Sequence, residues 1–103
     1  MPAVEMKSKL NPESVRGWLR TRRGWKRRSN NLTKAFEFTT FRDSIVFVNR
    51  VATLADSRKH HPEIDVRHAT VTLSLSTEGV GGITEQDLDL AEQIDFATSF
   101  GGH

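Results

Sequence analysis

The spacing of apolar residues predicts two long amphipathic helices in this chain. Between Phe41 and Lys59 apolar residues recur every three or four positions, which is the repeat of a helix that buries one face. The expected buried stripe is Phe41, Ile45, Val48, Ala52 and Ala55. The second long helix is predicted after Thr84, because Thr84 and Asp87 form a start like a capping box. Its expected apolar positions are Leu88, Ala91, Ile94 and Ala97.

A shorter helix is predicted near the beginning of the chain. Asn11 suits the N-cap position, and Pro12 suits the first helical position. The apolar residues Val15, Trp18 and Leu19 follow at helical spacing, and the helix is expected to stop before Gly24.

Alternating apolar and polar residues predict strands between these helices. Residues 25–29 and 32–38 flank Asn30-Asn31, which we expect to form the turn of a hairpin. Residues 70–76 alternate most clearly, and residues 64–67 fit a short edge strand after Pro62 has ended the long helix. The order helix-strand-strand-helix-strand-strand-helix predicts an α+β fold, with a four-stranded antiparallel sheet and helices packed on one of its faces.

The length of 103 residues fits one domain. We expect residues 1–10 to be a flexible segment, residues 11–100 to be the folded domain, and residues 101–103 to be a disordered tail. Hydrophobic residues make up only 36% of the chain, so assembly into a homodimer or higher homo-oligomer would add useful buried surface.

Several classes of protein are disfavoured by composition. Cysteine is absent, which excludes disulfides and thiolate chemistry. No apolar run approaches the ~18 residues of a membrane span, and the first residues lack the apolar core of a signal peptide. We therefore expect a soluble, cytoplasmic protein that makes no use of a membrane.

The net charge of +2 conceals an uneven distribution. Basic residues are concentrated in the first third, whereas no Lys or Arg occurs from position 68 onward. Either the two ends of the chain pack against each other, or they form surfaces for partners or for self-association. The candidate partner-binding residues are Arg20, Arg23, Arg27 and Arg28. A net charge so close to zero makes a nucleic-acid partner an unfavoured interpretation.

The densest polar cluster is the run from Arg58 to Glu63, which contains His60 and His61. Adjacent histidines point in different directions, and the chain has neither cysteine nor a His-x-x-x-His pair, so we predict no metal and no other cofactor. Imidazoles titrate near neutral pH and suit proton transfer. Residue types alone equally fit solvated histidines at the end of a helix.

The combined motifs resemble the pterin-4a-carbinolamine dehydratase family from about Asn11 to Phe96. The resemblance rests on Trp25, residues 34–38, Phe41, residues 47–52, the run His60-His61-Pro62-Glu63-Ile64, and Asp87. It implies an α+β domain, commonly dimeric or tetrameric, that converts a 4a-hydroxytetrahydropterin to the quinonoid dihydropterin. It also implies acid-base roles for His60, His61 and the position of Glu78, and a pterin pocket that includes Pro62, His68 and Asp87.

Two positions depart from the family pattern. Glu78 occupies the place of a histidine, and His68 occupies the place of a larger aromatic residue. A carboxylate is normally anionic and is therefore a poor proton donor.

These departures leave two main hypotheses. In one, dehydration is lost or weakened and the scaffold binds another protein as an assembly factor or chaperone. A relative of this type assembles Rubisco in α-carboxysome bacteria, which would imply a Rubisco client and association with the carboxysome. In the other, the chain is an active dehydratase with a modified site and a pterin ligand. Binding of a transcription factor is a third alternative.

Overall fold

The computed structural model describes residues 8–101, with side chains up to residue 98. Its elements follow the predicted order, and they are α2 (Pro12–Arg20), β1 (Lys26–Arg28), β2 (Asn31–Glu37), α3 (Phe41–Arg58), β3 (Glu63–Arg67), β4 (Thr70–Leu75) and α4 (Glu85–Gly101). No helix within the described residues is long and apolar enough to cross a membrane.

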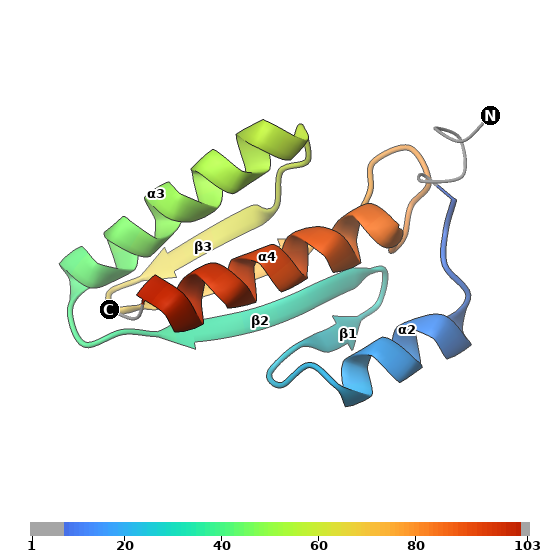
Figure 1. Ribbon diagram of the computed structural model, residues 1–103, viewed down its shortest axis with the longest axis horizontal. Coiled ribbons are helices and arrows are strands. Elements are labelled where there is room, and N and C mark those ends of the chain that lie inside the picture. Colours follow the sequence, from blue (N-terminus) through green and yellow to red (C-terminus); the bar gives the residue numbers. More distant parts are fainter. Residues whose placement is uncertain (1–7, 102–103) are drawn as a thin grey trace.

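The strands form a four-stranded sheet in the order β1-β2-β4-β3, with every neighbouring pair antiparallel. Leu32 lies opposite Leu75, and Phe36 lies opposite Val71, so the apolar residues of the two central strands share one face. All four side chains are buried. Helices α3 and α4 lie along this face, as Figure 1 shows. The predicted α+β fold with a four-stranded antiparallel sheet is confirmed.

Helix α3 begins at Phe41 as predicted and ends one residue earlier than predicted, and the predicted buried stripe was correct for Ala55 but wrong at two positions. Phe41 and Ala52 are exposed. The buried residues of the helix are Ser44, Phe47, Val51 and Ala55. Residues 45–48 are all apolar, so the sequence allows either of two faces of the helix to be buried. Packing against the sheet and α4 decides which face it is. The hydroxyl of Ser44 tolerates burial because it lies 2.6 Å and 3.0 Å from the carbonyl oxygens of Phe41 and His68.

The apolar side of α4 also differs from the prediction. Ala91 and Ile94 are buried as expected, but the fully buried leucine is Leu90, whereas Leu88 and Ala97 are only half-buried. Helix α4 packs against the sheet and lies between α2 and α3. It therefore buries more of its circumference than a single helical stripe would.

The first hairpin turns one residue earlier than predicted. Arg28 pairs with Asn31, so the turn consists of Ser29 and Asn30, with Ser29 at a φ of 57°. This register follows from the sheet, because it places Leu32 on the buried face opposite Leu75. At the start of α2, the Asn11 side chain accepts a 2.8 Å hydrogen bond from the N–H of Ser14, as its N-cap role predicts.

The described ends of the chain are attached to the domain. The N–H of Leu10 donates to the carbonyl of Ile83 at 2.8 Å, and the Leu10 side chain packs against the core. Order therefore begins before residue 11, and residues 1–7 of the predicted flexible segment lie outside the described residues. Helix α4 extends through Gly101, one residue into the predicted tail, while residues 102–103 lie outside the described part.

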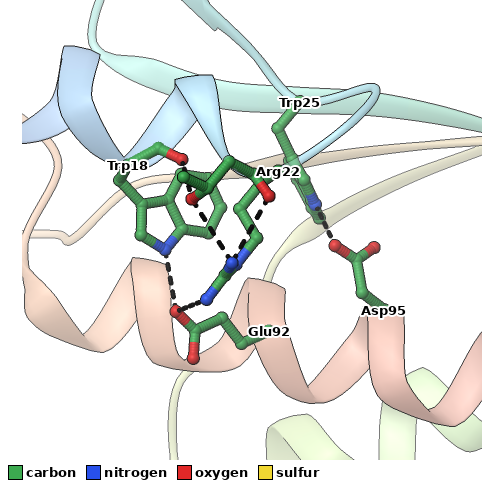
Figure 2. Close-up of polar contacts among 6 residues, drawn as sticks. Trp18, Arg22, Trp25, Glu92 and Asp95 are labelled. Atoms are coloured by element: carbon green, nitrogen blue, oxygen red, sulfur yellow. Dashed lines mark hydrogen bonds and ion pairs between the residues drawn. The ribbon is translucent and has the colours of Figure 1, made fainter.

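The oppositely charged ends of the chain meet within the fold. Figure 2 shows that side chains from α2 and the following loop reach the acidic residues of α4. The indole of Trp18 and the guanidinium of Arg22 both donate to Glu92, at 2.9 Å and 2.8 Å. The indole of Trp25 donates to Asp95 at 2.8 Å. The interpretation that the two ends pack against each other is confirmed.

Candidate functional site

A polar cleft of about 770 Å³ lies where α3 ends, β4 ends and α4 begins. It is lined by Arg58, Lys59, His60, His61, Glu63, Ser74, Ser76, Thr77, Glu78 and Gln86. The structure therefore brings together the three residues predicted for acid-base chemistry, which are His60, His61 and Glu78.

The backbone at the end of α3 places His60 at the rear of this cleft. Lys59 caps the helix in the left-handed conformation, with a φ of 53°, and turns the chain out of the helical path. The N–H of His60 then donates to the carbonyl of Ala55 at 3.1 Å. The ring is buried, and its Nε2 lies 2.6 Å from Oδ1 of the fully buried Asp87.

Asp87 is held by a network of donors at the start of α4. Its Oδ2 accepts from the hydroxyl of Thr77 at 2.8 Å and from the N–H of Thr84 at 2.9 Å. The hydroxyl of Thr84 lies 2.7 Å from that of Thr77 and accepts from the N–H of Gln86 at 3.2 Å. Both carboxylate oxygens of Asp87 are therefore engaged, Oδ2 by two donors and Oδ1 by His60.

This network fixes the tautomer of His60. Because the Asp87 carboxylate only accepts hydrogen bonds, Nε2 of His60 must carry the hydrogen that joins them. The other ring nitrogen, Nδ1, makes no hydrogen bond within the described residues. No buried side-chain nitrogen or oxygen of that part lacks a partner, so Nδ1 must be accessible. His60 therefore presents Nδ1 to the cleft, while Asp87 supports the ring from behind.

His61 has a different environment. Its Nε2 lies 2.9 Å from Oδ1 of Asp56, in the last turn of α3, and both side chains are exposed. The cleft thus combines an enclosed imidazole with an open one, each with a carboxylate partner. Such a pair can accept a proton at one position and donate a proton at another.

Glu78 lines the cleft from the loop after β4. It is exposed and makes no side-chain hydrogen bond or ion pair within residues 8–101. Gln86 also lines the cleft. The position at which the family pattern has a histidine therefore does belong to the cleft.

The remaining predicted pocket residues lie elsewhere. His68 is in the turn between β3 and β4, at a φ of 55°, and its carbonyl faces Ser44 near the start of α3. The five residues of β3 separate it from His61 by about 17 Å at ~3.3 Å per residue, so His68 does not line the cleft. Pro62 is half-buried beside His61 without lining the cleft, and Asp87 lies behind His60.

The sequence did not predict that Asp56 pairs with His61, or that Thr77 and Thr84 hold Asp87. Thr84 was predicted only as part of a helix start, whereas Asp87 was also predicted as a pocket residue; in the structure the N–H of Thr84 donates to Asp87, the partner of His60. Asp56 lies in the final turn of α3 and precedes its partner His61 by five residues. No group of three or more His, Cys, Asp or Glu side chains within residues 8–101 is arranged to hold a metal ion.

The four candidate partner-binding arginines are exposed and lie outside the cleft. Arg20 ends α2, Arg23 follows it, and Arg27 and Arg28 belong to β1. The guanidinium of Arg27 donates to the carbonyl of Ser29 at 3.1 Å.

Comparison with known proteins gives a consistent picture. The sequence pattern of the family described as Pterin 4 alpha carbinolamine dehydratase matches residues 8–97. A protein of Roseiflexus sp. (strain RS-1), whose name assigns it to the pterin-4-alpha-carbinolamine dehydratases, is 43% identical over 90 residues, which cover 87% of this chain and 97% of the relative. A protein of Mycobacteroides abscessus with the same assignment is 51% identical over 72 residues, covering 70% and 77% of the two chains.

Two solved structures share the fold. A transcriptional coactivator/pterin dehydratase from Brucella melitensis superposes with a TM-score of 0.83 at 26% identity, covering 86% of this chain and 97% of its own. A pterin dehydratase-like protein described as a RuBisCO assembly factor in the alpha-carboxysome superposes with a TM-score of 0.58 at 20% identity, covering 70% and 83%. The second likeness concerns the fold alone.

Proposed function

This chain belongs to the pterin-4a-carbinolamine dehydratase family, and from that membership we propose that it dehydrates a 4a-hydroxytetrahydropterin. The observation that carries the proposal is the buried 2.6 Å contact between His60 and Asp87, which opens onto a cleft that also holds His61 and Glu78. The reaction is an elimination of water, which needs a base and an acid at neighbouring atoms of the substrate.

We assign the base to His60. Its accessible Nδ1 takes the proton from N5 of the pterin, and Asp87 stabilises the positive charge that the ring then acquires. The electron pair of the N–H bond forms the double bond between N5 and C4a. As that bond forms, the C4a–O bond breaks and its electrons leave with the oxygen.

We assign the acid to His61, which gives a proton to the departing hydroxyl so that it leaves as water. Glu78 is not assigned as the acid, because an exposed carboxylate can accept a proton but is a poor donor. The exposure of His61 lets it recover its proton from solvent after each turnover. The replacement of the family histidine by Glu78 is expected to make the reaction slower than in a member with three histidines.

Stopped-flow dehydration of chemically generated 4a-hydroxytetrahydropterin tests this proposal. The unmodified chain should accelerate dehydration, and His60→Gln should lower kcat at least about 100-fold, the range for loss of general acid-base catalysis. His68→Gln is the matched control, because it changes the same side chain outside the cleft and should retain the rate. An inert unmodified chain that gains activity on Glu78→His would show that the pocket persists without its chemistry and would contradict the proposal.

A second candidate function is the binding of a protein client in an assembly or chaperone role, with dehydration lost or weakened. It is favoured by exposed cations outside the cleft, since Arg20, Arg23 and Arg28 make no side-chain hydrogen bond or ion pair within residues 8–101. The assembly role of the RuBisCO-associated neighbour suggests Rubisco as the client to test first. Co-purification with the Rubisco large subunit would support it, and unchanged Rubisco assembly after deletion of the gene would exclude this client.

The two candidate functions also differ in the cellular location that we expect. We propose a cytoplasmic homo-oligomer for the dehydratase, and association with the carboxysome only for the assembly role. Light scattering of the purified chain would reveal the oligomer, and a monomer at all concentrations would contradict it.

A further inference from the structure

A second hollow lies apart from the polar cleft and shares no lining residue with it. This groove has a volume of about 580 Å³ and lies between the loop after α2, strand β2 and the C-terminal half of α4. It is lined by Thr21, Arg22, Arg23, Lys34, Phe36, Asp95, Phe96 and Thr98. None of these residues has a role in the proposed dehydration.

The groove has an apolar component. The ring of Phe36 is buried and packs edge-on against Trp25, with 6.2 Å between ring centroids. The ring of Phe96 lines the same groove but is 63% exposed, the largest exposure among the large hydrophobic side chains of the described residues. A largely exposed aromatic ring beside a buried one offers a contact surface for an apolar side chain of a ligand.

Cations surround this apolar component. Arg22, Arg23 and Lys34 line the groove, against a single acid, Asp95. Arg22 and Lys34 are paired with acids of α4, at 2.8 Å and 2.9 Å. Arg23 is exposed and makes no side-chain hydrogen bond or ion pair within residues 8–101, and the same is true of the nearby Arg20. The groove therefore keeps positive charge that the fold itself does not neutralise.

The two paired cations are each held by more than one contact within the fold. Arg22 is held between Glu92 and the face of Trp18, 5.6 Å from the ring centroid, as Figure 2 shows for its polar contacts. Lys34 lies 4.8 Å from the Phe36 ring centroid and 5.7 Å from that of Trp25. A ligand that enters here need not order these side chains, which lowers the entropic cost of binding.

We propose that this groove binds an acidic segment of a partner protein that carries an aromatic or large aliphatic side chain. The apolar side chain would lie between Phe36 and Phe96, and a carboxylate beside it would meet the guanidinium of Arg23. Guanidinium groups bind carboxylates through paired hydrogen bonds, which accounts for an arginine at this position. The inference gives the protein-binding candidate a specific site, and it stands whether or not the cleft dehydrates a pterin.

The test uses the full chain and a random peptide display library. Selection should enrich peptides in which Asp or Glu flanks one aromatic or large aliphatic residue. A synthetic peptide of the enriched sequence should then change the tryptophan fluorescence, since both tryptophans contact cations of the groove. Arg23→Glu and Phe96→Ser should each weaken its binding at least about tenfold, the effect of losing one important interface contact.

Arg42→Glu is the matched control, because it makes the same charge change at an exposed arginine that lies outside the groove and outside the candidate partner-binding residues. It should leave the affinity within a factor of about two at physiological ionic strength. Circular dichroism establishes that each variant is folded, and Arg23→Gln replaces Arg23→Glu if that variant is not.

Three results would overturn the inference. One is a selection without enrichment of acidic residues, and another is an equal loss of affinity for the groove and control variants. The third is self-association that Arg23→Glu abolishes, because the occupant would then be a second copy of this chain. The dehydration assay is run on the same variants, so loss of peptide binding at the groove and loss of dehydration in the cleft are measured separately.

Discussion

Glu92 illustrates how a single residue connects distant parts of this chain. Its carboxylate accepts hydrogen bonds from the indole of Trp18 and the guanidinium of Arg22, which come from the other end of the sequence. The Trp18 hydrogen bond and then the Arg22 contacts lower the pKa of Glu92 below its ordinary value of 4.5, and burial opposes them only in part. A pKa that is lower in the folded state stabilises the fold above pH ~4.5, and this contribution is lost as the pH falls through the folded-state pKa.

We therefore expect Glu92→Gln to destabilise the protein more at pH 7 than at an acidic pH below the folded-state pKa, where the native carboxyl is protonated as well. The difference should be about 1 kcal/mol or less, because solvent screens a carboxylate whose side chain is 39% exposed. Urea unfolding at the two pH values measures it. Glu13→Gln, which alters an exposed 3.5 Å contact with Arg16, is the control and should show a smaller difference. An equal loss for Glu92→Gln at both pH values would contradict the prediction.

At the scale of elements, periodicity located the helices and strands better than it oriented them. Strand β4 alternates without ambiguity, and its apolar residues are buried as predicted. Helix α3 carries apolar residues on two sides, and only contact with the sheet and α4 decides that Phe47 and Val51 enter the core while Phe41 and Ala52 do not. The hairpin turn was misplaced by one residue for a similar reason, because the partner strand sets the register.

Two alanines of α3 test this orientation. Ala55 is 1% exposed, so Ala55→Leu should overpack the buried side of α3 and cost about 1–3 kcal/mol of unfolding free energy. Ala52→Leu makes the same change on the exposed side and should shift stability by no more than about 0.5 kcal/mol. Chemical denaturation of both variants measures the contrast. A larger loss for Ala52→Leu would mean that the helix is rotated relative to this description.

At the scale of the whole molecule, the N-terminal segment is joined to the loop that carries Glu78. Leu10 donates to the carbonyl of Ile83, and the side chain of Lys9 covers Gly82 so closely that a Cβ there would lie 2.7 Å from it. The loop between β4 and α4 is thus held from outside the predicted domain boundary. This contact bears on the cleft because Thr77, Glu78 and Thr84 all belong to the same connection.

A chain that starts at Asn11 should therefore be less stable than one that starts at Ser8. Removal of Leu10 leaves the carbonyl of the buried Ile83 without its donor, which costs about 1–3 kcal/mol. Thermal unfolding of the two truncated chains measures the difference, and hydrogen exchange should show faster opening of residues 77–84 in the shorter one. Equal stability of the two truncated chains would contradict this prediction and support a domain boundary at residue 11.

The sequence by itself determined the order of the elements, the fold class, the family and the two histidines of the cleft, because capping residues, alternation and the His-His-Pro run are local signals. Tertiary structure alone decided which side of α3 is buried, that Asp87 supports His60 from behind, and that His68 lies away from the cleft. It also decided that the charged ends of the chain neutralise each other only in part, which leaves Arg23 beside an apolar groove. The physical reason is that each of these features depends on contacts between residues far apart in sequence, which no local pattern specifies.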